Sequence, residues 1–148
     1  QVVDPPHPCA GSAYPHGLFA SRDFKRGVTL GQYAGCIQSG AAHARRHWSR
    51  HAQGQYGIEL DVSDGLCSAL GLVLDAKHVG NECRMINDYR DIAAECNVRF
   101  MTVASPSKGV WVDVIATRAI GSGDEILADY DDGAAGRAPR ASPSTTTT

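Results

Sequence analysis

The chain has 148 residues, of which 43% are hydrophobic and 20% are charged, and its formal net charge is −2. This length supports one domain with a core of its own, because a domain of about 150 residues buries roughly two-thirds of its unfolded surface. No apolar run approaches the roughly 18 residues of a membrane helix, so we expect no membrane span. The small negative charge argues against a chain-wide nucleic-acid footprint and leaves local basic patches open.

Both ends of the chain differ in composition from its middle. Residues 1–15 contain four prolines without hydrophobic periodicity, which predicts an extended N-terminal arm. Residues 134–148 are small and polar with nothing to bury, so we expect a disordered, low-complexity tail. The domain itself is therefore predicted over residues 16–133.

The middle of the chain alternates short apolar runs with turn residues. Runs rich in β-branched and aromatic residues, bounded by Gly, Asp, Ser and Pro, are typical of strands. The strand candidates are 19–24, 28–35, 56–62, 70–76, 97–105, 109–117 and 125–130. Residues 39–53, rich in Ala and Arg, form the best helix candidate. The pattern predicts a mainly β domain with few short helices.

The five cysteines are an odd number and show no short metal-ligand spacing. We therefore expect reduced thiols that act as small buried apolar side chains, and no metal. A zinc site built from distant cysteines and histidines is the alternative.

Three segments contain residues suited to chemistry, and each also has a purely structural interpretation. Gly17 can let a backbone approach a ligand closely, or it can simply open a strand after a turn. Asn87 can donate and accept at once, which suits a ligand with an amine and a carboxylate, or it can belong to a turn. Tyr130 ends a predicted strand amid five carboxylates in residues 124–132, which would attract a cation, or it is a core tyrosine of a hairpin.

Taken together and in this order, the segments resemble the SET-domain protein lysine methyltransferases. HGLFASRDFKRG resembles the family's opening motif, GQYAG its Tyr-x-Gly element, DAKHVGNECRMIN its Asp-Ala, Gly-Asn and Arg-aromatic-Ile-Asn sequence, and EILADY its closing motif. Each motif is weak alone, and their joint occurrence over residues 16–133 is a strong signal. The resemblance implies a SET-domain fold of small twisted sheets with a C-terminal pseudoknot, an exception to the rule against threading.

The resemblance also implies a mechanism and a set of site residues. S-adenosylmethionine would bind one face, and a lysine would enter a narrow channel from the other, where it loses its proton easily. Tyr130 matches the channel tyrosine and Tyr33 the Tyr-x-Gly tyrosine, the two expected catalytic residues. The expected cofactor-binding residues are Gly17, Leu18, Phe19, Arg84, Asn87 and Asp88.

Three departures from the family pattern matter. Asp88, Tyr89 and Arg90 stand where the family has His-Ser-Cys, although Asp88 can still offer its backbone to the adenine, and Asn97 matches a later family asparagine. Ala128 stands where the family often has Phe or Tyr, which implies room for a di- or trimethylated product. The family's flanking cysteine-rich zinc modules are missing.

The implied substrate is a basic protein tail, most simply a histone tail, bound as an extended strand, and the implied location is the nucleus. Residues 43–51 contain three Arg, three His and no acid, which suits either a solvated helix face or contact with nucleosomal DNA. A non-histone substrate and an inactive peptide-binding module are the alternatives. Oligomeric state does not follow from the sequence.

Overall fold

The structure is a computed structural model that describes residues 1–13, 15–42, 56–60 and 71–131. The predicted tail, the basic segment 43–51 and most of the predicted helix lie outside the described residues. Of that helix, residues 40–42 are described and are helical.

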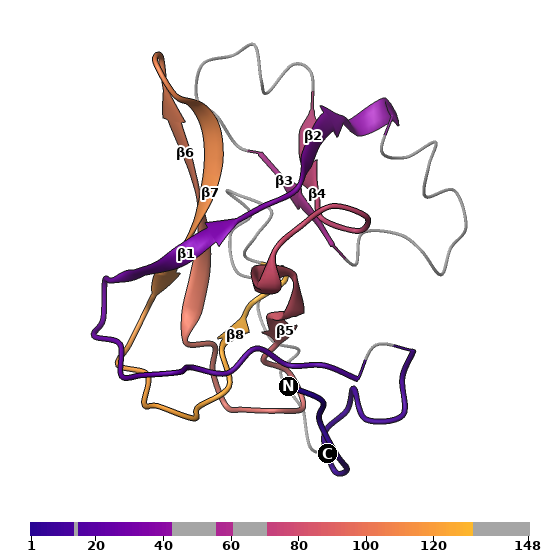
Figure 1. Cartoon of the computed structure of the whole chain (residues 1–148), viewed down its shortest axis with the longest axis vertical. Helices are drawn as coiled ribbons and strands as arrows, with labels where there is room; N and C mark the ends of the chain where they lie inside the picture. The colour runs from indigo at the N-terminus through magenta and orange to yellow at the C-terminus, as the bar shows by residue number, and fades with distance from the viewer. Residues whose placement is uncertain (14, 43–55, 61–70, 132–148) are drawn as a thin grey trace, which may run out of the picture.

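The larger sheet has three antiparallel strands in the order β1-β7-β6 (Figure 1). They are β1 (Thr29–Tyr33), β7 (Gly109–Ala116) and β6 (Val98–Ser105). Because side chains alternate across a strand, Val112, Val114 and Ala116 all point inward and are at most 2% exposed. This face of β7 packs into the hydrophobic core.

A second antiparallel sheet has the order β2-β4-β3. It consists of β2 (Cys36–Ser39), β4 (Leu72–Asp75) and β3 (Gly57–Glu59). The chain passes from the first sheet to the second through Gly35, where an added Cβ would lie 2.7 Å from the carbonyl oxygen of Asp75. Glycine is required there because two backbones meet at that point.

The smallest sheet joins distant parts of the chain. Strand β5 (Asn87–Asp88) pairs in parallel with β8 (Leu127–Ala128). On the other side of β8, Asn97 donates its backbone N–H to the carbonyl of Leu127 at 2.9 Å. The end of the domain thus runs between two parts of the 87–97 loop, as the pseudoknot requires.

Sequence and structure differ at three elements. Residues 19–24 form no strand; they make two isolated bridges, Phe19 to Glu125 and Phe24 to Ile120. Strand β2 and the 3₁₀ helix η1 (Glu82–Met85) have no counterpart among the predicted elements. The hydrophobic core includes residues from both larger sheets, and Ile86, Val98 and Ile120 are among its most buried members.

The N-terminal arm lies against the domain. Val2 pairs with His16 in an antiparallel bridge, and residues 5–12 form successive turns. Val3 is buried, so the arm contributes to the packed surface.

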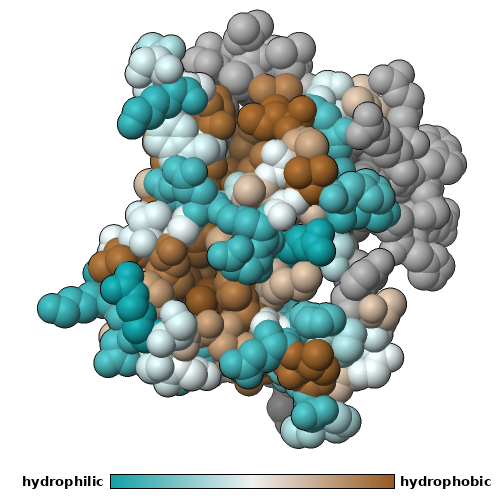
Figure 2. Space-filling model, in the orientation of Figure 1, coloured by the Kyte–Doolittle hydropathy of each residue, from teal (hydrophilic) through white to brown (hydrophobic). Residues whose placement is uncertain are grey.

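On the face shown in Figure 2, hydrophobic areas are interrupted by a hydrophilic band. No helix within the described ranges is both long and apolar enough to cross a bilayer.

Candidate active site

Asn87 stands where three distant segments meet. It follows η1 and the buried Ile86, and it begins β5. Its Nδ2 donates to the carbonyl of His16 at 3.0 Å and to Oε1 of Glu125 at 2.9 Å. The opening, middle and closing motifs of the sequence therefore converge on one amide group.

Gly17, Leu18 and Phe19 pack directly against the closing motif. An added Cβ on Gly17 would collide with Oε1 of Glu125, so no larger residue fits without displacing that carboxylate. The carbonyl of Leu18 accepts the N–H of Ile126 at 2.7 Å, and Phe19 forms its bridge with Glu125. This segment and the 125–126 segment form one unit.

The N-terminal arm contacts the same polar groups. Gly17 exchanges two backbone hydrogen bonds with Gln1, at 2.9 and 2.8 Å. The Cys9 thiol lies 3.6 Å from Oδ1 of Asn87, and Nε2 of His7 lies 3.1 Å from Oε2 of Glu125. Burial, and then the Glu125 charge, raise the pKa of the Cys9 thiol. The arm thus contacts Gly17 and Asn87, two of the residues that the sequence assigns to the cofactor.

Tyr33 and Tyr130, the two expected catalytic residues, lie near each other, and their catalytic roles stay a prediction. The hydroxyl of Tyr130 donates to the carbonyl of Ile86 at 2.7 Å, and the hydroxyl of Tyr33 donates to the carbonyl of Tyr56 at 3.2 Å. Burial raises the pKa of the Tyr33 phenol, and the nearby Tyr130 phenol raises it further. Tyr130 is 45% exposed as a whole, but desolvation of its hydroxyl group raises its pKa too. Both phenols therefore stay protonated at neutral pH.

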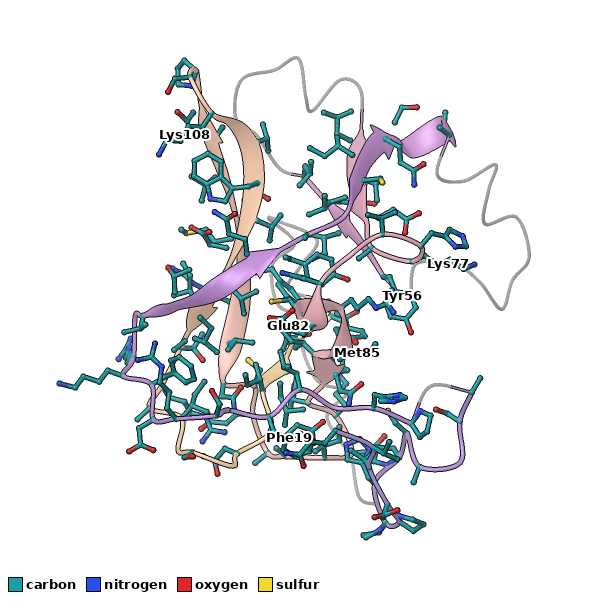
Figure 3. The ribbon with its side chains drawn as sticks, viewed as in Figure 1. Phe19, Tyr56, Lys77, Glu82, Met85 and Lys108 are labelled. Carbon is teal, nitrogen blue, oxygen red and sulfur yellow. The ribbon has the colours of Figure 1, made fainter. Side chains whose placement is uncertain are left out.

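Tyr56 is a member of this cluster that sequence reasoning missed. Its carbonyl accepts from Tyr33 and from the N–H of Ala76, and the Arg84 guanidinium lies 6.0 Å from its ring centroid. In the view of Figure 3, Tyr56 lies next to η1, the element that contains Arg84. In the sequence Tyr56 only opens a strand-like run, so nothing distinguishes it from an ordinary strand residue.

The Arg84 guanidinium contacts backbone carbonyl groups of the chain. Its Nη1 lies 3.4 Å from the carbonyl oxygen of Ala76 and 3.5 Å from that of Lys77, which braces the turn after β4. A contact between Arg84 and a cofactor stays a prediction.

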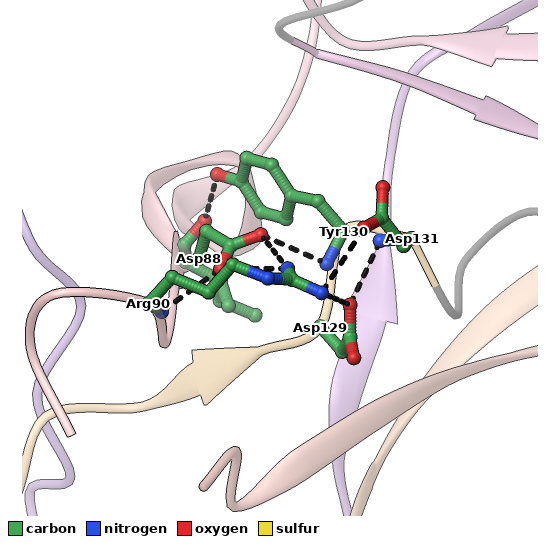
Figure 4. Close-up of polar contacts among 6 residues, drawn as sticks. Asp88, Arg90, Asp129, Tyr130 and Asp131 are labelled. Carbon is green, nitrogen blue, oxygen red and sulfur yellow. Dashed lines mark hydrogen bonds and ion pairs between the residues drawn. The ribbon is translucent and has the colours of Figure 1, made fainter. Parts of the chain in front are cut away.

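Asp88 and Arg90, the unusual residues after Asn87, form the centre of a charged cluster (Figure 4). Nη1 of Arg90 donates to both carboxylate oxygens of Asp88, at 3.0 and 2.8 Å. Nη2 of Arg90 donates to Asp129 at 3.0 Å and to Asp131 at 3.1 Å. The Asp88 carboxylate also accepts the backbone N–H of Tyr130 at 3.2 Å.

The five carboxylates of residues 124–132 are therefore not one patch around Tyr130. Asp124 accepts the backbone N–H of Gly121, and Glu125 faces Asn87 and His7. Asp129 and Asp131 face Arg90, and Asp132 lies outside the described residues.

Asn97 has a structural role that its side chain fulfils completely. Its Nδ2 donates to the carbonyl of Glu125 at 2.8 Å, and its Oδ1 accepts the N–H of Leu127 at 2.8 Å. It is 4% exposed, so water does not compete for these bonds.

Among the cysteines that the structure describes, Cys9, Cys36 and Cys83 are free thiols. Within the described ranges, no three His, Cys, Asp or Glu side chains are grouped so as to hold a metal ion.

The model of the SET domain matches residues 16–131. The chain therefore belongs to the SET-domain family, the family of protein lysine methyltransferases that its motifs resemble. No curated protein matches the chain.

Several solved structures have a similar fold. An apo ctPRC2 structure in an autoinhibited state is 25% identical, with a TM-score of 0.67 over 82% of this chain and 14% of that chain. A ctPRC2 structure in an autoinhibited conformation bound to S-adenosylmethionine is also 25% identical, with a TM-score of 0.65 over 82% and 14%. A humanized mutant of Polycomb Repressive Complex 2 from Chaetomium thermophilum, bound to an inhibitor, is 25% identical, with a TM-score of 0.63 over 79% and 13%. The chain thus spans about one-seventh of these proteins.

Proposed function

We propose that this chain is a protein lysine N-methyltransferase that uses S-adenosylmethionine. The observation that carries the proposal is the convergence at Asn87, whose amide joins the opening motif at His16 and the closing motif at Glu125. A fold match alone supports no activity, whereas here motifs more than 30 residues apart build one polar centre.

The polar groups at Asn87 fit the methionine end of the cofactor. Oδ1 of Asn87 meets the Cys9 thiol at 3.6 Å, a weak donor that an ammonium group can replace. Asn87, the backbone of Gly17, Leu18 and Phe19, and the backbone of Asp88 would hold the cofactor, with Arg84 bracing the loop. When bound, S-adenosylmethionine supplies an activated methyl group on a positive sulfonium.

Tyr33 and Tyr130 suit the task of orienting a lysine amine. Each phenol commits its hydrogen to a backbone carbonyl, of Tyr56 and Ile86 respectively. Each phenol oxygen therefore keeps lone pairs that can accept N–H bonds from the amine, which aims the nitrogen lone pair at the methyl group. A lysine in solution has a pKa of about 10.4, and entry into an apolar channel favours its neutral form.

We infer that the substrate is a basic protein tail, in the first place a histone tail, bound as an extended strand, with the nucleus as the place of action. The carboxylates of Asp129 and Asp131, on either side of Tyr130 in the sequence, put negative charge near this end of the site, which supports a basic substrate. A non-histone protein lysine is the alternative, and the same assay with histone and non-histone substrates separates the two.

Methyl transfer from S-adenosylmethionine to recombinant core histones tests the proposal. We expect Tyr130→Phe to lose most activity while cofactor binding survives, because one amine acceptor and the bond to Ile86 disappear. Tyr89→Phe is the matched control, since it removes a phenol hydroxyl for which the described part of the chain provides no hydrogen bond. Equal activity of wild type and Tyr130→Phe would contradict the assigned role, and transfer to no protein substrate would favour a binding module.

The number of methyl groups transferred is a second expected outcome. Ala128 stands where the family often has a large ring and lies fully buried in β8. A small side chain there leaves room for further methyl groups on the amine, so we expect di- or trimethylated lysine. Intact-mass spectrometry of the product at long reaction times counts the groups, and a monomethyl product alone would refute this expectation.

A further inference from the structure

The residues after Asn87 differ from the family pattern, and the structure gives them a shared task. One guanidinium, that of Arg90, bridges three carboxylates from two segments of the chain. Asp88 belongs to the loop after Asn87, whereas Asp129 and Asp131 flank Tyr130 directly. The cluster therefore restrains the residues on both sides of Tyr130, Asp129 and Asp131 (Figure 4).

The same cluster reaches the backbone of Tyr130 itself. The Asp88 carboxylate that accepts from Arg90 also accepts the N–H of Tyr130 at 3.2 Å. The N–H of Asp131 donates to Asp129 at 2.9 Å, and the N–H of Arg90 donates to Asp88 at 2.9 Å. The main chain at residues 88–90 and 129–131 is thus fixed by interlocking bonds that share one cation.

A single exposed ion pair contributes little because water screens it and its side chains lose entropy. This cluster differs, since four charged groups share bonds and one fork-shaped guanidinium makes most of them in fixed geometry. The guanidinium also lies 4.9 Å from the ring centroid of Tyr89, which supports it from another side.

We propose that Arg90, together with Asp88, positions Tyr130 for methyl transfer. This inference rests on the proposed function, in which Arg90 is a positioning residue that acts through Tyr130. We call Arg90 with Asp88, Asp129 and Asp131 the clasp. Its first part, the segment Asp88-Tyr89-Arg90, stands where the family usually has another sequence. Loss of the clasp frees the 129–131 segment, so the Tyr130 hydroxyl leaves the Ile86 carbonyl for part of the time. A displacement of about 1 Å can lower the rate of an oriented reaction up to a hundredfold.

Kinetics of three variants test this role. We expect Arg90→Ala to lower kcat on the order of tenfold while the KM for S-adenosylmethionine stays within about twofold, because orientation is lost and binding is kept. Arg90→Lys should fall in between, since an ammonium cannot bridge three carboxylates as a fork. Arg118→Ala is the matched control; Arg118 is 47% exposed, close to the 43% of Arg90, and makes a single long pair with Glu95 at 3.7 Å. We expect it to behave as the wild type.

A second readout does not depend on activity. With the five tyrosines of the chain replaced by 3-fluorotyrosine, ¹⁹F NMR gives a resonance for each, and Tyr130→Phe identifies that of Tyr130. We expect this resonance to shift or broaden in Arg90→Ala and to stay unchanged in Arg118→Ala. Circular dichroism melts check that all variants are folded.

The outcomes are distinguishable. An unchanged Tyr130 resonance in Arg90→Ala overturns the inference, even if activity falls, because Arg90 would then act elsewhere. A raised KM for the protein substrate with unchanged kcat also overturns it, because Arg90 would then contribute to substrate charge recognition. A wild-type chain without methyl transfer defeats the proposed function, while the fluorine spectrum still decides the positioning role.

Discussion

Two asparagines, Asn87 and Asn97, show how one residue type takes two roles. Asn87 is half-buried and its Oδ1 contacts only a weak thiol donor, Cys9. Asn97 is buried, and its amide group donates to the carbonyl of Glu125 and accepts the N–H of Leu127. The first is therefore suited to a ligand, and the second holds β8 in place.

The role of Asn97 predicts a large loss of stability on truncation. Asn97→Ala leaves a partly buried carbonyl of Glu125 and a buried N–H of Leu127 without the Asn97 amide, which should lower the free energy of unfolding by about 2–4 kcal/mol. Asn81→Ala is the matched control, because Asn81 also bonds two backbone groups, those of Ala34 and Gln32, but at the surface. Its loss should cost less than about 1 kcal/mol. Urea unfolding measures the free energy of unfolding of both variants, and similar losses would contradict the structural role assigned to Asn97.

At the same scale, sequence reasoning succeeds where a residue type dictates its chemistry. Gly17 and Asn87 could be named as site candidates because few other residues offer such close backbone approach or a group that both donates and accepts. Their convergence could not be predicted from the residues alone, because the contacts of Asn87 with His16 and Glu125 span 71 and 38 positions. The clasp at Arg90 could not be predicted for the same reason, since its partners Asp129 and Asp131 lie 39 and 41 positions away.

At the scale of elements, strand periodicity predicts the long strands and misses two of the short ones, β2 and β5. Strands β6 and β7 have eight residues each, so the alternation of apolar and polar positions is visible in the sequence. Strand β5 has two residues and depends on tertiary pairing, whereas β8, also of two residues, lies within the predicted strand 125–130. The 19–24 segment looks like a strand because of Phe19 and Phe24, but each aromatic residue only makes a single bridge.

The N-terminal arm shows another difference between composition and contacts. Its proline-rich composition favours an extended segment laid on or leading into the domain, and it contains no information on where the arm docks. The docking depends on specific contacts, those of His7 with Glu125 and Cys9 with Asn87. The arm therefore lies over the polar centre, where a cofactor would replace some of its contacts.

For the whole molecule, the order of the motifs along the chain indicates the family, and the family match over residues 16–131 confirms it. The fold then explains why motifs so far apart in the sequence belong together. Strand β8 runs between residues 87–88 and residue 97. It thereby brings Glu125 to Asn87 and Tyr130 to Ile86. We propose that this junction binds S-adenosylmethionine.

Titration calorimetry of S-adenosylmethionine into the wild-type chain, into Asn87→Ala and into the control Asn81→Ala tests that claim most directly, with thermal melts to verify folding. We predict binding by the wild type and the control, and binding at least about tenfold weaker in Asn87→Ala, since a hydrogen bond to a charged ligand group contributes roughly 1.5–3 kcal/mol. No binding by the wild type, or equal binding by wild type and folded Asn87→Ala, would contradict the account.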